Sequence, residues 1–269
     1  MKERPVVEKA AHSGEAKAAM LSNDPTRYLV RSVLAGMYLS IVVLVYWSLA
    51  QGLHDNSFGK VIASAFFGVG LSVIVFTQAE LFTSNCMYLA VSSAERITSW
   101  RDTMRVWTIC YLGNLLGALL VTGLLWGAGV LGELPVDHAL FTGAAHKVHQ
   151  SAQAIFFKGI LANWVVCLAI WVGLNLKEEM AKLTSTILVV FIFLYLGFEH
   201  SIANMGTFAM SLAAGGQISL GEALYNLIFS TLGNIVGGAV LVGFAYRFLS
   251  PGPQKAETEE VLQATRSGH

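Results

Sequence analysis

Charged residues are scarce in this 269-residue sequence. Only 13% of the residues are Asp, Glu, Lys or Arg, whereas 55% are hydrophobic and the mean hydropathy is +0.60. A soluble domain needs roughly a quarter of its residues charged to cover its surface. The sequence therefore excludes an ordinary soluble protein and predicts an integral membrane protein. Its formal net charge of zero does not indicate a partner, because the positions of the charges along a membrane protein carry the information.

Cysteine is also scarce, and its spacing excludes several kinds of site. Cys86, Cys110 and Cys167 lie in apolar stretches without C-x-x-C spacing, which suggests neither a disulfide framework nor a metal site. The sequence also lacks the motifs of nucleotide-driven transport, serine hydrolases and dinucleotide binding. We therefore predict no enzyme activity, no metal or other cofactor, and no patch that binds nucleic acid.

Long apolar stretches alternate with short polar ones and predict six transmembrane helices. A helix rises 1.5 Å per residue, so about 20 apolar residues cross roughly 30 Å of hydrocarbon. Two of the stretches are longer than one crossing requires and contain polar residues. The predicted spans cover about residues 28–50, 60–93, 106–131, 154–176, 183–214 and 223–249.

The two ends of the chain are polar and flank a membrane domain at residues 28–250. Residues 1–27 lack the apolar segment of a cleavable signal and predict a cytoplasmic arm, which could lie as an amphipathic helix on the membrane surface. Residues 251–269 open with Pro-Gly-Pro, which stops the last helix, and predict a disordered cytoplasmic tail.

The distribution of Lys and Arg predicts the orientation. With both termini inside, fourteen of these residues fall on the inner side, and only Lys60, Lys147 and Lys158 fall on the outer side. Inner loops of membrane proteins carry an excess of positive charge. We therefore predict a multi-pass protein of the plasma membrane with both termini in the cytoplasm.

An internal repeat relates the two halves of the chain. Residues 112–118 (LGNLLGA) match residues 232–238 (LGNIVGG), and the pair Glu80 and Asn85 recurs 119 residues later as Glu199 and Asn204. Each repeat holds three spans, so the halves must enter the membrane from opposite sides. We therefore predict two inverted three-helix repeats with the second and fifth helices broken, a pattern typical of transport proteins.

The two halves also carry a shared G-N-x-x-G motif. Its glycines would let neighbouring helices approach closely, and its asparagines, Asn114 and Asn234, would form hydrogen bonds between helices or to the loops. These roles are structural and follow from the small size of glycine and the two-sided hydrogen bonding of an amide.

A group of polar residues lies at membrane depth in residues 197–205 (GFEHSIANM). Ionisable groups inside a membrane are costly, so they indicate a functional site by default. The repeat assigns Glu80 and Glu199 a structural role, accepting hydrogen bonds from backbone amides and asparagines at the breaks. His200 has no such counterpart, because Leu81 occupies the equivalent position.

Four segments resemble signature sequences of the formate/nitrite transporter family. They are residues 80–83 (ELFT), 146–149 (HKVH), 159–163 (GILAN) and 197–205. The resemblance covers about residues 20–250. It implies an aquaporin-like protomer in a homopentamer, with one pore per protomer, and small anions as substrates.

The resemblance also implies roles for individual residues. His200 would be the central histidine, Asn163 an amide near it, and Thr83 a loop hydroxyl that faces it. Lys147 would attract anions at the outer vestibule. Five residues would form apolar constrictions on either side of a central chamber: Phe67, Leu71, Leu81, Phe82 and Phe193.

These residues predict a channel for small monovalent weak-acid anions, with formate as the leading substrate. An apolar ring excludes a bare charge at a cost of several kcal/mol. Lys147 would raise the local anion concentration, and His200 would donate a hydrogen bond or a proton, so that the anion crosses as a neutral or partly neutral species. The outer histidines, His138, His146 and His149, lack metal-site spacing, which favours a solvated or vestibule-lining role over metal binding.

Two alternatives remain open at the level of sequence. One is a nitrite or hydrosulfide channel of the same family, although the retained HKVH segment favours formate. The other is a pore for neutral molecules such as water, glycerol or ammonia, which would not need Lys147 at its entrance.

Overall fold

The computed structural model describes residues 3–250, and every regular element in this range is a helix. The all-helical prediction is therefore confirmed for these residues, and the predicted tail at 251–269 lies outside them. The helices are α1 (Glu3–Asn23), α2 (Pro25–Gly52), α3 (Gly59–Thr77), α4 (Phe82–Ala94), α5 (Trp100–Gly127), α6 (Ala139–Val148), α7 (Ala152–Asn175), α8 (Glu179–Tyr195), α9 (Ser201–Ala213), α10 (Leu220–Ile235), the π-helix η1 (Val236–Phe244) and α11 (Ala245–Leu249).

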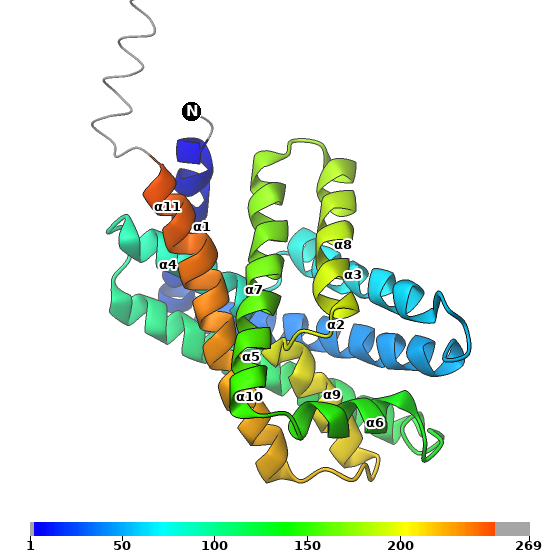
Figure 1. Ribbon diagram of the computed structural model, residues 1–269. Coiled ribbons are helices and arrows are strands. Elements are labelled where there is room, and N and C mark those ends of the chain that lie inside the picture. The colour runs from blue at the N-terminus through cyan, green and yellow to red at the C-terminus, as the bar shows by residue number, and fades with distance from the viewer. Residues whose placement is uncertain (1–2, 251–269) are drawn as a thin grey trace, which may run out of the picture.

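Five helical segments are long and apolar enough to cross a membrane. They are α2, α3, α5, α7 and the continuous helix formed by α10, η1 and α11. The apolar stretch predicted as the fifth span is divided into α8, with 17 residues, and α9, with 13. Figure 1 shows α2 with α3 and α7 with α8 as two helical hairpins that point in different directions.

Side-chain caps in the sequence determine where several helices begin. Ser99 and Asp102 form a capping box at the start of α5, and Ser219 and Glu222 form one at the start of α10. Each box satisfies amide groups that the first turn of a helix leaves without partners. The two boxes lie 120 residues apart, so the starts of α5 and α10 use the same local chemistry.

Two breaks interrupt the helices at the polar residues that the sequence singled out. The first lies between α3 and α4, and the second lies between α8 and α9. The backbone turns at Gln78 with φ 56° and at Gly197 with φ 70°. The next helices start from extended residues with nearly equal angles, Leu81 at φ −105° and ψ 125° and His200 at φ −107° and ψ 110°. The two breaks therefore share one backbone path.

Glycines of the shared motif allow two pairs of helices to touch. A Cβ added at Gly117 on α5 would lie 2.1 Å from the Val33 carbonyl oxygen of α2. One added at Gly237 would lie 2.2 Å from the Ile160 carbonyl oxygen of α7. Real Cβ atoms do not approach backbone so closely, which confirms the predicted packing role of these glycines.

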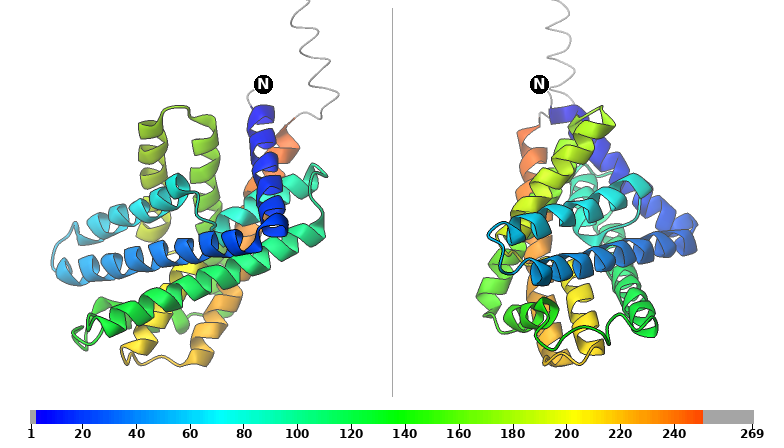
Figure 2. Two further views of the ribbon diagram at one scale, coloured as in Figure 1. Left: turned by 180° about the vertical axis from the view of Figure 1, so that it is seen from behind. Right: turned by 90° about the vertical axis from the view of Figure 1, so that its right-hand side faces the viewer.

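The N-terminal helix α1 packs on the rest of the protein. Val7, Ala10 and Ala11 are fully buried, and a Cβ at Gly14 would lie 2.6 Å from the Tyr88 carbonyl oxygen of α4. Both views in Figure 2 show α1 alongside the body of the molecule. The predicted arm is thus a helix whose apolar face contacts protein, whereas the sequence suggested one that lies on the membrane surface.

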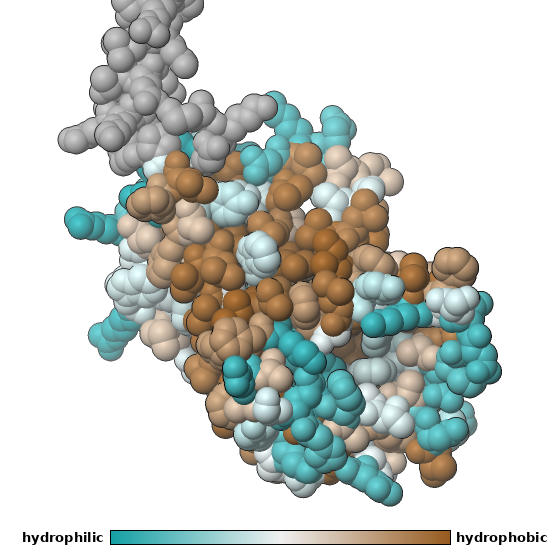
Figure 3. Space-filling model, in the orientation of Figure 1, coloured by the Kyte–Doolittle hydropathy of each residue, from teal (hydrophilic) through white to brown (hydrophobic). Residues whose placement is uncertain are grey.

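Apolar side chains also cover much of the outer surface, as the brown areas of Figure 3 show. Leu220, Leu224, Ile228 and Leu232 form an exposed row along α10, because residues four apart lie on the same helix face. A surface of this kind suits hydrocarbon or neighbouring apolar protein, and not water.

Candidate functional site

Two cavities lie next to the two breaks. The α1 cavity has a volume of about 270 Å³, and α1, α2, α3 and the first break contribute residues to its lining. The α6 cavity has a volume of about 190 Å³ and is lined by residues of α2, α3, α6, α8 and α9 and of the second break. The two cavities share no lining residue.

Each break places a buried carboxylate against a lysine from a neighbouring helix. The side chain of Glu80 is 3% exposed and lies 2.7 Å from the ammonium group of Lys17 on α1. That of Glu199 is 1% exposed and lies 3.1 Å from the ammonium group of Lys147 on α6. An unpaired buried charge is strongly destabilising, so each lysine neutralises a carboxylate that the break holds inside the protein.

Amide side chains complete the hydrogen bonds of both carboxylates. Asn85 donates to Glu80 over 3.0 Å, and Asn204 donates to Glu199 over 2.6 Å, as the sequence predicted. Gln150 donates to the other oxygen of Glu199 over 2.9 Å. The predicted bonds from backbone amides to these carboxylates are absent among the described contacts.

Asn114 and Asn234 hold the backbone of the breaks instead. The Asn114 amide oxygen accepts from the Phe82 N–H over 2.9 Å, and its amide nitrogen donates to the Glu80 carbonyl over 2.8 Å. Asn234 accepts from the Ser201 N–H over 2.8 Å and donates to the Glu199 carbonyl over 2.9 Å. These bonds satisfy backbone groups that a broken helix leaves free, and they confirm the loop-tethering role predicted for both asparagines.

His200 lines the α6 cavity and has defined partners on both ring nitrogens. Its Nδ1 accepts a hydrogen bond from the Ala203 N–H over 3.2 Å, and its Nε2 lies 3.1 Å from the Thr83 hydroxyl. An accepting Nδ1 carries no proton, so the neutral ring carries its proton on Nε2. The imidazole therefore presents an N–H donor on the side of Thr83.

Asn163 acts on Thr83 and not on the imidazole. Its amide nitrogen donates to the Thr83 carbonyl over 3.0 Å and to the Asn234 carbonyl over 2.6 Å. It therefore positions the start of α4, which carries the hydroxyl that faces His200. The family resemblance implies an amide near the histidine. In the structure this amide contacts Thr83, and Thr83 in turn contacts His200.

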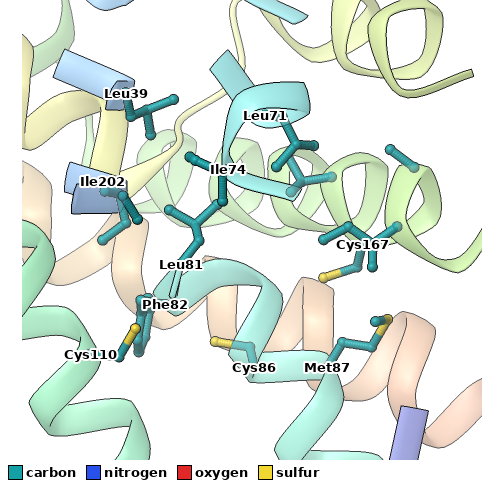
Figure 4. Packing of buried hydrophobic residues seen from close by; sticks show 14 of the residues in the cluster. Leu39, Leu71, Ile74, Leu81, Phe82, Cys86, Met87, Cys110, Cys167 and Ile202 are labelled. Atoms are coloured by element: carbon teal, nitrogen blue, oxygen red, sulfur yellow. The ribbon is translucent and has the colours of Figure 1, made fainter. Parts of the chain in front are cut away.

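The residues predicted to form constrictions are buried but lie in different surroundings. Phe67 and Phe193 line the α6 cavity with ring centroids 5.7 Å apart, and Phe193 stacks on the His200 ring at 5.6 Å. Leu71 lines the α1 cavity. Figure 4 shows Leu81 and Phe82 within the buried apolar cluster, and neither residue lines the α1 cavity or the α6 cavity.

The outer histidines have three different surroundings. His138 caps α6 by accepting a hydrogen bond from the Leu140 N–H, and burial lowers the pKa of its imidazole. His146 lines the α6 cavity, and His149 lies 3.3 Å from Glu222. Within residues 3–250, no group of three or more His, Cys, Asp or Glu side chains could hold a metal ion.

Several residues of the site were missed in the sequence. Lys17 is separated from Lys147 by 130 residues, which differs from the repeat offset of 119 to 120, so the repeat did not pair the two lysines. Gln150 and Asn226, which donate to Glu199, are 49 and 27 residues away from it in sequence. Their role depends on where α6 and α10 meet the break.

Comparisons with known proteins identify the family of this chain. Residues 4–248 match the family model described as formate/nitrite transporter. An uncharacterized transporter, YwcJ of Bacillus subtilis (strain 168), is 37% identical over 87% of this chain and 93% of its own. In Escherichia coli (strain K12), the nitrite transporter NirC is 34% identical over 91% of both chains. The formate channel FocA of the same strain is 33% identical over 86% of this chain and 89% of its own.

Solved structures give the same result. A structure described as an FNT family ion channel has a TM-score of 0.87, with 31% identity over 91% of this chain and 99% of its own. A pentameric formate channel with formate bound has a TM-score of 0.70, with 28% identity over 83% and 96%. These relatives are channels and transporters and not enzymes, and the apolar helices fit a multi-pass membrane protein. The chain belongs to the formate/nitrite transporter family.

Proposed function

We propose that this protein is a channel for small monovalent weak-acid anions and that formate is its leading substrate. The observation that carries the proposal is the His200 imidazole, whose Nε2 faces the Thr83 hydroxyl at 3.1 Å while its ring stacks on Phe193. The imidazole and the Phe193 ring together give the α6 cavity a hydrogen-bond donor beside an apolar wall. The HKVH segment at residues 146–149 supports formate.

Nitrite is a second candidate substrate. NirC and FocA resemble this chain to almost the same degree, at 34% and 33% identity. Formate and nitrite are both planar anions with two oxygens, so a site built from N–H and O–H donors suits either. Hydrosulfide, which the family resemblance also suggests, lacks such oxygens.

The transport step follows from the cost of burying a charge. Phe67 and Phe193 offer no hydrogen bonds, and a bare anion between them would lose its hydration at a cost of several kcal/mol. The His200 Nε2–H and the Thr83 hydroxyl replace part of that hydration. A proton taken up from the solution on the entry side and passed to the anion near His200 would remove the charge of the anion. The resulting acid would cross as a neutral or partly neutral species and release this proton on the far side, and the imidazole would return to its neutral form.

Lys147 has a modified role in this proposal. It attracts anions to the α6 cavity, but its charge is shared with Glu199 at 3.1 Å. An approaching anion therefore meets an ion pair and not a free ammonium group. Gln150 and Asn226 also donate to the Glu199 carboxylate of this pair. The lysine would stabilise the anionic form only near the entrance.

The architecture belongs to the same proposal. We assign six spans as two inverted three-helix repeats, with α3–α4 and α8–α9 as the two broken spans of an aquaporin-like protomer. The matched backbone angles and the paired bonds of Asn114 and Asn234 support this symmetry. Residues 28–250 form the channel in the plasma membrane, residues 1–27 and 251–269 lie in the cytoplasm, and the pentamer named for one structural relative is the proposed assembly.

A flux assay on one reconstituted preparation tests the substrate. Proteoliposomes containing the full chain are exposed to equal gradients of formate, nitrite, hydrosulfide and glycerol, and vesicle volume is followed by stopped-flow light scattering. We expect formate to permeate fastest, nitrite next and glycerol no faster than in empty liposomes. Glycerol flux equal to formate flux would overturn the anion channel in favour of a neutral-solute pore. Nitrite flux faster than formate flux would make nitrite the leading substrate.

A further inference from the structure

Arg31 is the charged residue of the α1 cavity whose charge no residue between positions 3 and 250 offsets. Lys17 and Glu80 face the same cavity but neutralise each other at 2.7 Å. Arg31 on α2 is half-buried and lines the cavity. Its guanidinium forms no ion pair and no hydrogen bond with another described residue between positions 3 and 250. The cavity therefore has a net positive charge that is located on Arg31.

The equivalent position at the second break shows that this charge is specific to one side. The Arg31 carbonyl accepts from the Glu80 N–H over 3.1 Å, and the Lys158 carbonyl accepts from the Glu199 N–H over 3.4 Å. The two residues thus hold the same backbone position. However, the Lys158 ammonium group donates to Gln150, and Lys158 is not among the residues that line the α6 cavity.

The chemistry of a guanidinium defines what it would bind. It is planar, permanently charged and carries five N–H donors in a fork that matches two oxygens of one anion. Paired bonds of this kind are among the strongest in proteins. The cavity of about 270 Å³ has room for a small anion and several waters, since each water takes about 30 Å³. Glu80, the carboxylate that lines the cavity, is already engaged by Lys17 and Asn85.

We propose that Arg31 makes the α1 cavity a binding site for a small planar oxyanion, either a monocarboxylate or nitrite. The site loads the channel from the α1 side before the anion reaches the apolar region near Leu71. This inference rests on the proposed anion-channel function and adds a residue that determines affinity and preference on one face. Among residues 3–250, the lining of the α6 cavity includes no arginine, so half-saturation from the α1 side occurs at a lower anion concentration.

The test uses three variants of the full chain. Arg31→Gln removes the charge, and Arg31→Lys keeps the charge but loses the planar fork. Arg27→Gln is the matched control, because Arg27 lies one turn earlier on α2, is exposed and does not line the cavity. Currents are recorded in inside-out and outside-out patches from giant spheroplasts, so that each face is titrated separately with formate, nitrite or hydrosulfide.

We expect Arg31→Gln to raise the half-saturating formate concentration about tenfold on the α1 side, as loss of a charged hydrogen bond implies. The value on the α6 side and the values for Arg27→Gln stay unchanged. Arg31→Lys gives an intermediate shift for formate and nitrite and leaves hydrosulfide unaffected.

Two outcomes would overturn the site. Equal shifts in Arg31→Gln and Arg27→Gln would mean that both arginines act only through the surface potential. An unchanged half-saturation in Arg31→Gln would mean that the guanidinium contacts lipid phosphate or serves only to orient the chain.

A failure of the channel function itself gives a different result, since the parent protein would then carry neither formate nor nitrite current. Formate binding to the detergent-solubilised protein, followed by saturation-transfer NMR, decides the question in that case. A formate affinity in Arg31→Gln equal to that of the parent would refute the site. The same samples, checked by size-exclusion chromatography, show whether each variant has folded.

Discussion

At the scale of single residues, the buried carboxylate of Glu199 depends on four side-chain hydrogen-bond donors. Lys147, Gln150, Asn204 and Asn226 all donate to its carboxylate, which is 1% exposed. Four donors from different elements converge on one group, so the carboxylate connects α6, α9 and α10 to the second break. Glu199 therefore stabilises the contacts between these helices, and its carboxylate neutralises Lys147 in the α6 cavity.

Glu199→Gln should therefore destabilise the protein strongly. The Lys147 side chain is 16% exposed and would lose the one carboxylate partner that residues 3–250 give it, which costs about 3–5 kcal/mol for a buried pair. We expect a clearly lower Tm in differential scanning fluorimetry of the purified protein. Glu8→Gln, which removes the half-exposed partner of Arg4, is the control and should change stability by about 0.5 kcal/mol or less.

The pairing explanation has its own test in a double variant. If the loss comes from an uncompensated ammonium group, adding Lys147→Met to Glu199→Gln should recover part of the Tm. A double variant that is less stable than Glu199→Gln alone would show that Lys147 contributes independently of the carboxylate.

His200→Asn should retain the fold but remove the pH dependence of formate flux. Asparagine is a strong N-cap residue, so it can replace the cap that His200 gives to the Ala203 N–H. Asparagine has no ring nitrogen that can take up and release a proton, whereas the imidazole has one. Flux is measured in proteoliposomes over this range, with Thr83→Ser as a control that keeps the hydroxyl. A pH profile equal to that of the parent would contradict a proton relay through His200.

At the scale of helices, the glycine contacts make a sharp comparison possible. Gly117→Ala and Gly237→Ala place a methyl group about 2 Å from a backbone carbonyl, and such overpacking costs about 1–3 kcal/mol. Gly123 lies on the same helix as Gly117 with nothing within 4 Å of an added Cβ. Gly123→Ala should be neutral or stabilise the protein by up to about 1 kcal/mol. Equal Tm values for all three variants would disprove the close-contact role.

The helices and breaks could be predicted because their signals are local. Apolar length marks the spans, and the polar residues Glu80 and Glu199 mark the breaks, since unwound backbone at this depth needs polar partners. The π-helix η1 has no comparable signal, because its bonding differs from that of an α-helix by only one residue. The docking of α1 was missed for a related reason: small residues such as Ala10 and Gly14 bury well only when α4 is already in place.

Some residues of the candidate site could be recognised from local sequence signals, and others could not. His200, Asn114 and Asn234 were found because a polar residue in an apolar stretch, or a repeated motif, is visible in the sequence itself. Lys17 and Arg31 looked like ordinary inner-side charges that orient the chain. Only the fold shows that Lys17 reaches Glu80 and that Arg31 lines the α1 cavity.

At the scale of the whole molecule, the proposed symmetry makes α1 and α6 equivalent elements on opposite faces. Each carries the lysine that neutralises the carboxylate of a break, and Figure 1 shows the two helices at opposite ends of the molecule. A chain in which these helices meet different compartments would place one cavity on each side of the membrane. The anion path would then run from one cavity to the other past His200 and the apolar residues around it.

Thiol labelling tests this arrangement directly. His12 on α1 and His149 after α6 have side chains 68% and 62% exposed, so a cysteine at either position should react freely. The parent chain is the control, because Cys86, Cys110 and Cys167 are all buried. In intact spheroplasts, we expect a membrane-impermeant maleimide to label His149→Cys at once and His12→Cys only after permeabilisation. Labelling of both from outside would contradict the inverted repeat, because α1 and α6 would then share a face. Labelling of position 12 alone would keep the repeat but reverse the orientation, and Arg31 would then bind anions on the outer side.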